Sequence, residues 1–234
     1  MKPASREAPQ QLVLELPHRQ ALGLEDFLVS RSNAAAVELV DAWPRWENRA
    51  VLVLGPKGSG KSHLANVWRS ASGGDVIAAA GISDASVAML EARRALVIED
   101  IDRGVSDETV FFHLLNLARE KGFAILMTSR SAPGDIPITL PDLRSRLRAL
   151  PLVAIEEPDD GLLNGVLVKL FADRQLAVEP HVISYLALHM TRSMEAASRV
   201  VAAIDKLSLA RQRRVTRAIA ADGLAAVAAE TEGE

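Results

Sequence analysis

The stretch Gly55-Pro56-Lys57-Gly58-Ser59-Gly60-Lys61-Ser62 decides the fold of this chain. It matches G-x-x-x-x-G-K-[ST], the pattern of a loop that cradles phosphate groups. The apolar run at 50–54 predicts a strand before the loop, and the residues from His63 onward predict a helix after it. The alternative is a glycine-rich turn that arose by chance. The agreement of every motif position with its context favours the phosphate-binding loop.

This loop predicts the binding of a di- or triphosphate. Its glycines let the backbone curl so that the N–H groups and the helix N-terminus face an anion. We expect Lys61 to lie against the β and γ phosphates and the Ser62 hydroxyl to bind Mg²⁺. The predicted nucleotide-binding residues are Gly55, Pro56, Lys57, Gly58, Ser59, Gly60, Lys61, Ser62 and His63.

A second chemical landmark is the segment 95–100, in which four apolar residues are followed by Glu99 and Asp100. The pattern predicts a buried strand whose carboxyl end presents two acids, where open α/β sheets place their ligands. Glu99 is predicted to hold the Mg²⁺ shell and Asp100 to orient an attacking water. The alternative is a strand that merely ends at a solvated turn.

Composition bounds the remaining function classes. The chain has 234 residues, a hydrophobic fraction of 49% and no cysteine, which excludes disulfides and thiolate metal sites. It has no apolar run of membrane-spanning length and no signal-peptide pattern, so we expect a cytoplasmic protein without a membrane partner. The net charge of −3 argues against broad nucleic-acid binding, so DNA contact should be indirect or weak. Four C-terminal arginines leave a local contact open beside the alternative of solvated charges: Arg211, Arg213, Arg214 and Arg217.

The order of predicted elements gives the fold class. Strand patterns at 50–54, 75–79, 95–98, 123–129 and 152–155 alternate with helical patterns, and only helical patterns follow residue 158. This order predicts an α/β core with a five-stranded parallel sheet and then a small all-α domain. The predicted divisions are a flexible N-terminal tail at 1–20, a nucleotide-binding core at 21–157 and a helical domain at 158–234.

The N-terminal segment Gln11-Leu12-Val13-Leu14-Glu15-Leu16 has two interpretations. It predicts an edge strand of the domain itself, or an extended peptide that lies in a groove of another protein.

The sequence of motifs resembles that of AAA+ ATPases: a P-loop, an acidic strand end, a helix with Leu143-Arg144-Ser145-Arg146-Leu147 and a helical lid. More narrowly it resembles the AAA+ module of the replication initiator DnaA, and within that group the Hda family, whose members inactivate DnaA. The printed sequence ends soon after the predicted lid, which leaves no room for DnaA's helix-turn-helix domain. The segment 11–16 resembles the Q-L-x-L-x-L peptide by which such factors bind the DNA sliding clamp.

The resemblance implies a negative regulator of DNA replication initiation that stimulates ATP hydrolysis on DnaA. By position, Arg146 matches the arginine finger that reaches a neighbour's nucleotide, and Arg192 matches the sensor II arginine of the lid. Phe27 lies in a segment that resembles the adenine-embracing part of initiators. The implied cofactors are ADP or ATP with Mg²⁺, and the implied partners are DnaA and the sliding clamp, the β subunit of polymerase III. Clamp binding is assigned to Gln11, Leu12, Leu14 and Leu16.

Alternatives stay open at this point. Both arginines also fit solvated surface charges, and the chain also fits a stand-alone ATPase such as a helicase loader resembling DnaC, or a non-catalytic nucleotide-dependent adaptor. Homo-oligomer formation is left open. Glu99 is one methylene longer than the Asp usual in the relatives, and Arg130 stands where they usually place an Asp. We therefore expect nucleotide binding with weak or no ATPase activity of the chain alone.

Overall fold

The structure, a computed structural model, describes residues 28–232. The predicted clamp-binding segment at 11–16 and Phe27 lie outside the described residues.

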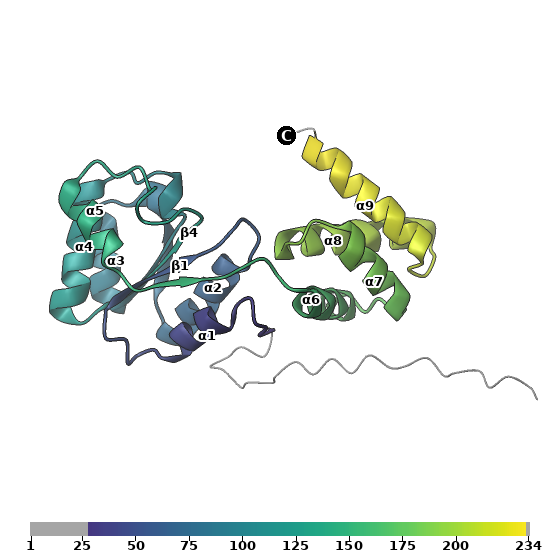
Figure 1. The fold of residues 1–234 in the computed structure, drawn as a ribbon, viewed down its shortest axis with the longest axis horizontal. Coiled ribbons are helices and arrows are strands. Elements are labelled where there is room, and N and C mark those ends of the chain that lie inside the picture. Colours follow the sequence, from purple (N-terminus) through teal and green to yellow (C-terminus); the bar gives the residue numbers. More distant parts are fainter. Residues whose placement is uncertain (1–27, 233–234) are drawn as a thin grey trace, which may run out of the picture.

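A five-stranded parallel sheet forms the centre of the N-terminal part (Figure 1). Its strands are β1 (Ala50–Leu54), β2 (Asp75–Ala78), β3 (Ala95–Glu99), β4 (Ala124–Ser129) and β5 (Leu152–Ala154). They lie in the order β2-β3-β4-β1-β5, and every pairing is parallel. The carboxyl ends of β1, β3 and β4 therefore meet at one edge, where the sequence places its P-loop and its acids.

Helices cover both faces of the sheet. One face carries α1 (Ala34–Asp41) and α2 (Lys61–Ser72), and the other carries α3 (Asp84–Arg93), α4 (Glu108–Lys121) and α5 (Pro141–Arg148). Side chains alternate along β3: Leu96 and Ile98 pack with the α3–α5 layer, whereas Val97 packs with α1 and α2. The continuous apolar strands thus supply both halves of a core, as expected for a sheet buried on both faces.

A second helical body follows β5. It contains α6 (Asp160–Asp173), α7 (Pro180–His189), α8 (Met194–Arg211) and α9 (Arg217–Glu232), which bury an apolar cluster of their own. Figure 1 shows this body beside the sheet rather than within its layers. Asp159 and Ser193 cap α6 and α8, because their side chains accept the N–H groups of Leu162 and Ala196. The predicted α/β core with a five-stranded parallel sheet, followed by a small all-α domain, is confirmed.

Among the helices at 28–232, none is both long enough and apolar enough to cross a membrane.

A phosphate-binding loop beneath a helical lid

The P-loop has the tight conformation that its glycines allow. Gly58 and Gly60 have φ angles of +74° and +100°, and Gly60 is the N-cap of α2. At Gly55 a Cβ atom would lie 2.6 Å from the Ile155 carbonyl oxygen, so only glycine fits between the loop and the chain after β5. The Ser59 Oγ is buried and has no hydrogen-bond partner among residues 28–232. The loop thus brings the start of α2 and an unsatisfied hydroxyl to one place.

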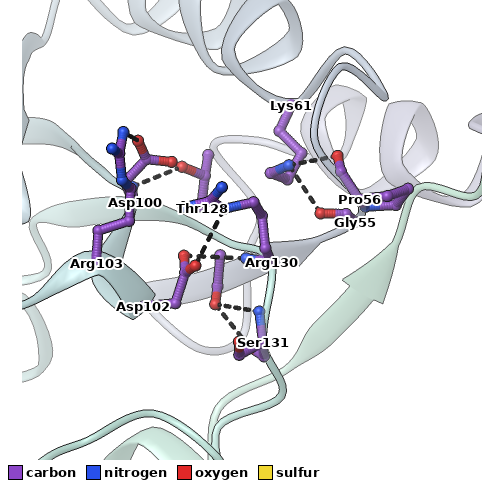
Figure 2. A network of polar contacts seen from close by, with 10 residues as sticks. Gly55, Pro56, Lys61, Asp100, Asp102, Arg103, Thr128, Arg130 and Ser131 are labelled. Carbon is purple, nitrogen blue, oxygen red and sulfur yellow. Dashed lines mark hydrogen bonds and ion pairs between the residues drawn. The ribbon is translucent and has the colours of Figure 1, made fainter. Parts of the chain in front are cut away.

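Lys61 is buried in this loop, and its Nζ donates to the carbonyl oxygens of Gly55 and Pro56, at 2.8 Å each (Figure 2). Burial lowers the pKa of Lys61 below its usual range, because it removes water from the ammonium group. The carboxylate of Asp100 acts in the opposite direction, and the guanidinium of Arg130 adds to the lowering. An anion bound at the loop would favour the charged ammonium and offset this burial.

The carboxyl ends of β3 and β4 lie next to Lys61 (Figure 2). Asp100 adopts the left-handed conformation, with φ of +57°, and its backbone N–H donates to Thr128 Oγ1 at 3.1 Å. Its carboxylate lies 3.5 Å from the Arg103 guanidinium. The Oε1 atom of Glu99 is buried and has no hydrogen-bond partner in the described structure. Such an orphaned oxygen is unfavourable unless another group, such as a cation, binds it.

Arg130 forms a close pair with Asp102 at the same edge (Figure 2). The Arg130 backbone N–H and Nε donate to the two carboxylate oxygens at 3.0 and 3.1 Å, and the Asp102 side chain is only 7% exposed. Burial by itself would raise the pKa of Asp102, but the hydrogen bonds and charge of Arg130 outweigh it and lower the pKa. The unusual arginine is thus neutralised by an acid of its own chain.

A cavity of about 590 Å³ lies between the P-loop and the helical body. This volume is in the range of small-molecule sites. It is lined by Leu28, Asn33, Lys57, Gly58, Ser59, Gly60, Lys61, Ser62, His63, Leu162, Val166, Lys169, Leu170, Asp173, Met194, Glu195 and Ser198. Polar backbone of the P-loop therefore faces the same cavity as apolar side chains of α6, an arrangement suited to a ligand with an anionic part and an apolar part.

The lid touches the P-loop directly. The Met194 backbone N–H donates to the Gly58 carbonyl oxygen at 2.7 Å, and Lys57 forms an ion pair with Glu195 at 3.3 Å. A Cβ atom at Gly58 would lie 2.7 Å from the Cβ of Ser193. The start of α8 therefore rests on the loop so closely that a side chain at Gly58 would have to displace it.

Arg192, the predicted sensor II residue, comes just before the residues that contact the P-loop, but it does not line the cavity. Its guanidinium binds the Asp160 carboxylate at 2.6 Å and the Pro158 carbonyl oxygen at 3.0 Å. The lid residues of α8 that do face the cavity are Met194, Glu195 and Ser198. The nucleotide-sensing role of Arg192 stays a prediction.

Arg146, the predicted arginine finger, lies on α5 and is half-buried. Its Nη2 donates to Asn116 Oδ1 at 3.1 Å, and its guanidinium lies 5.7 Å from the centre of the Phe112 ring. Both partners belong to α4. Arg146 does not line the cavity that the P-loop of its own chain faces.

The sequence reasoning missed the contribution of α6. Leu162, Val166 and Leu170 line the cavity, whereas Leu163, Leu167 and Phe171 of the same helix pack in the lid core. The sequence itself contains this pattern, because the residues of each set are spaced four apart and therefore lie on one face of the helix. Two adjacent apolar faces indicate a helix that buries one and offers the other to a ligand.

Comparison with known proteins identifies the helical body. Residues 165–219 match the family model described as "Hda, lid domain". This stretch of the chain is similar to the lid domain of Hda proteins. No curated protein matches this chain closely enough to count as a relative.

Several solved structures share the fold of this chain at low sequence identity. Domain III of the Thermotoga maritima replication initiation protein DnaA is 19% identical, with a TM-score of 0.70, and the match covers 85% of this chain and 93% of that one. AMPPCP-bound DnaA from Aquifex aeolicus is 22% identical, with a TM-score of 0.66 and coverage of 83% and 67%. The Thermotoga maritima RuvB Holliday junction branch migration motor is 17% identical, with a TM-score of 0.67 and coverage of 87% and 71%.

The chain spans about two thirds of two longer structures, 67% of the Aquifex DnaA and 66% of a structure described as a DNA replication initiation factor. At sequence identities this low, the structural similarity shows that this chain and these proteins share a fold.

Proposed function

We propose that this chain binds an adenine nucleotide at its P-loop and acts as a negative regulator of DNA replication initiation. In this proposal, a peptide at 11–16 tethers it to the DNA sliding clamp, and Arg146 enters the ATP site of DnaA and stimulates hydrolysis there. The observation that carries the proposal is the position of Arg146, which α4 holds away from the cavity of its own chain.

The cavity fits an adenine nucleotide. The glycine-built loop with the buried, unpaired Ser59 hydroxyl suits the phosphates, and the apolar face of α6 suits a purine base. The nucleotide analogue in the Aquifex DnaA structure, whose fold matches, supports adenine as the base.

Mg²⁺ also fits the residues present. Glu99 has a buried carboxylate oxygen without a hydrogen-bond partner in the part of the chain that the structure describes, and Ser62 lies in the first turn of α2 beside Lys61. Within residues 28–232 no group of three or more acids and histidines could hold a metal alone, so nucleotide phosphates would complete the shell. The ion would neutralise phosphate charge, while Asp100 would be available to orient water.

An arginine that enters the ATP site of another protein can regulate that protein by accelerating hydrolysis of its ATP. Phosphoryl transfer depends mainly on positioning and charge stabilisation, and an arginine supplied in trans contributes about 10³- to 10⁵-fold in rate. The contacts to Asn116 and Phe112 limit the freedom of the Arg146 side chain before docking, which reduces the entropy lost on binding. A clamp tether would raise the local concentration of the arginine, so a weak direct contact could suffice.

The test is ATP turnover measured with this chain alone, with DnaA, and with DnaA plus the clamp loaded on DNA. We expect stimulation only in the complete mixture, and its loss in Arg146→Ala. The matched control is Arg148→Ala, because Arg148 is an exposed arginine of the same helix. Equal stimulation by the Arg146 variant and the wild type would refute the arginine finger. Binding to DnaA without stimulation of ATP hydrolysis would instead support a non-catalytic adaptor.

The clamp tether has its own test. Replacing Gln11, Leu12 and Leu14 by alanine should abolish clamp binding, while nucleotide affinity and the thermal midpoint stay unchanged. A fall of several degrees in the midpoint would instead identify an integral strand.

The second candidate is an ATPase that works alone, as a helicase loader does. The orphaned Glu99 oxygen and Asp100 beside Lys61 favour it. Arg130, which stands where the resemblance implies an Asp, adds to the lowering of the Lys61 pKa and argues for weak turnover. Strong turnover without DnaA would establish this candidate.

A further inference from the structure

The turn between α8 and α9 concentrates positive charge. Between Lys206 and Arg217 the sequence has five cationic residues and no acidic residue, although the whole chain has a net charge of −3. In Figure 1 this turn lies at the outer end of the helical body, away from the sheet. A contact made there would leave both the nucleotide cavity and α5 accessible.

Hydrogen bonds fix the backbone of this turn. The buried Ser208 donates its hydroxyl to the Arg213 carbonyl oxygen at 2.6 Å, and the Arg213 N–H donates to the Ser208 carbonyl oxygen at 3.1 Å. Gln212 takes the left-handed conformation that ends α8, and Val215 is buried in the lid core. The arginines are therefore presented by an ordered turn and not by a loose loop.

The guanidinium groups of Arg213 and Arg214 are exposed, and neither has an ion-pair or hydrogen-bond partner within residues 28–232. Other arginines of the lid are paired: Arg174 with Asp205, Arg192 with Asp160 and Arg199 with Glu230. Two adjacent unpaired cations repel each other, and a bound phosphate would relieve that repulsion.

Two neighbours extend the patch. The Arg217 guanidinium lies 4.6 Å from the centre of the Tyr185 ring of α7, which orients it without neutralising it. Arg211 is paired with Asp222 of α9, so this acid is already neutralised. Arg213, Arg214 and Arg217 therefore form a group of three arginines with free charge, which we name the lid arginine patch.

We propose that the lid arginine patch binds the phosphodiester backbone of duplex DNA without reading its sequence. Planar guanidinium groups match phosphate oxygens in a bidentate manner. An anionic membrane is less well matched, because the patch segment exposes one large apolar side chain, Leu209, whereas membrane binding takes a continuous apolar face. This inference goes beyond the proposed function and does not depend on Arg146, DnaA or the clamp.

The test uses the full chain and a fluorescent duplex of mixed sequence, with affinity measured by anisotropy at several salt concentrations. Three phosphate contacts predict that affinity falls about 40-fold between about 50 and 200 mM salt, because each contact contributes about 0.9 to the logarithmic slope. For Arg213→Ala/Arg214→Ala we expect weaker binding at low salt and a fall of only about 3- to 4-fold over the same range. The matched control is Arg45→Ala/Arg119→Ala, which removes two exposed arginines from the surface of the nucleotide-binding domain.

The outcomes separate the alternatives. Unchanged DNA binding by the patch variant, or an equal loss in the control, overturns the proposal. So does a wild-type chain that does not bind the duplex at low salt. Patch-dependent binding to vesicles rich in phosphatidylglycerol, without binding to DNA, would assign the surface to a membrane and refute the DNA contact.

Discussion

Glu108 lies in the first turn of α4 and holds the segment that leads into α5. Its carboxylate accepts the Thr139 N–H at 2.9 and 3.0 Å, the Thr139 hydroxyl at 2.8 Å and the Leu140 N–H at 2.6 Å. Leu140 is the N-cap of α5, the helix that bears Arg146. One side chain therefore fixes the start of the helix on which the proposed function depends.

The perturbation is Glu108→Gln, which keeps the size of the side chain and removes its charge. A hydrogen bond to a charged group contributes about 1.5–3 kcal/mol and a neutral one about 0.5–1.5 kcal/mol, so we expect a loss of about 1–2 kcal/mol of unfolding free energy. Glu108→Ala leaves the N–H groups of Thr139 and Leu140 without this acceptor and should cost about 2–3 kcal/mol. Urea unfolding at neutral pH measures the loss of unfolding free energy in both variants.

The effect of Glu108 should depend on pH. Partial burial alone would raise its pKa, but the hydrogen bonds from Thr139 and Leu140 outweigh burial and lower the pKa below its ordinary value of 4.5. A carboxyl group whose pKa is lowered by folding stabilises the fold fully above its unfolded pKa, and this contribution disappears as the pH falls through the folded pKa. The difference between wild type and Glu108→Gln should therefore be constant above about pH 5 and shrink below pH 4.5.

Glu120→Gln is the matched control, because Glu120 is an exposed acid of the same helix. The reasoning is refuted if the two variants lose equal stability, or if the gap between wild type and Glu108→Gln persists unchanged at low pH.

Three other contacts give further expectations. Gly58→Ala should lose at least about 1 kcal/mol more than Gly122→Ala in thermal unfolding, because both positions have positive φ but only Gly58 meets the lid. Asp102→Asn should lower the free energy of unfolding by about 1–2 kcal/mol at neutral pH, measured with urea, because it weakens the hydrogen bonds to Arg130. The difference in stability between this variant and the wild type should shrink as the pH falls through the lowered pKa of Asp102. Asn116→Ala should reduce the stimulation of DnaA in the mixed turnover assay about 3- to 10-fold, because it removes the hydrogen bond that orients Arg146, while nucleotide binding stays unchanged.

Local sequence was sufficient to predict the elements of this protein and their order. The P-loop glycines, the apolar runs of β1, β3 and β4, and the caps at Asp159 and Ser193 each act within a few residues of the chain. Such patterns are readable because backbone geometry and burial periodicity are short-range properties. They located the phosphate-binding loop and the acidic strand end, and they predicted the helical lid.

The pairing of charged groups was decided by the tertiary structure. Arg192 binds Asp160, and Arg130 binds Asp102, across separations of about 30 residues. The sequence offers many acids to each arginine, and only the packing of the elements selects one. The same packing sets Glu195 against Lys57 and two of the α6 leucines in the cavity. Residue types therefore fixed which chemistry was available, whereas long-range packing decided which side chains meet, because partner choice depends on distances that no local pattern encodes.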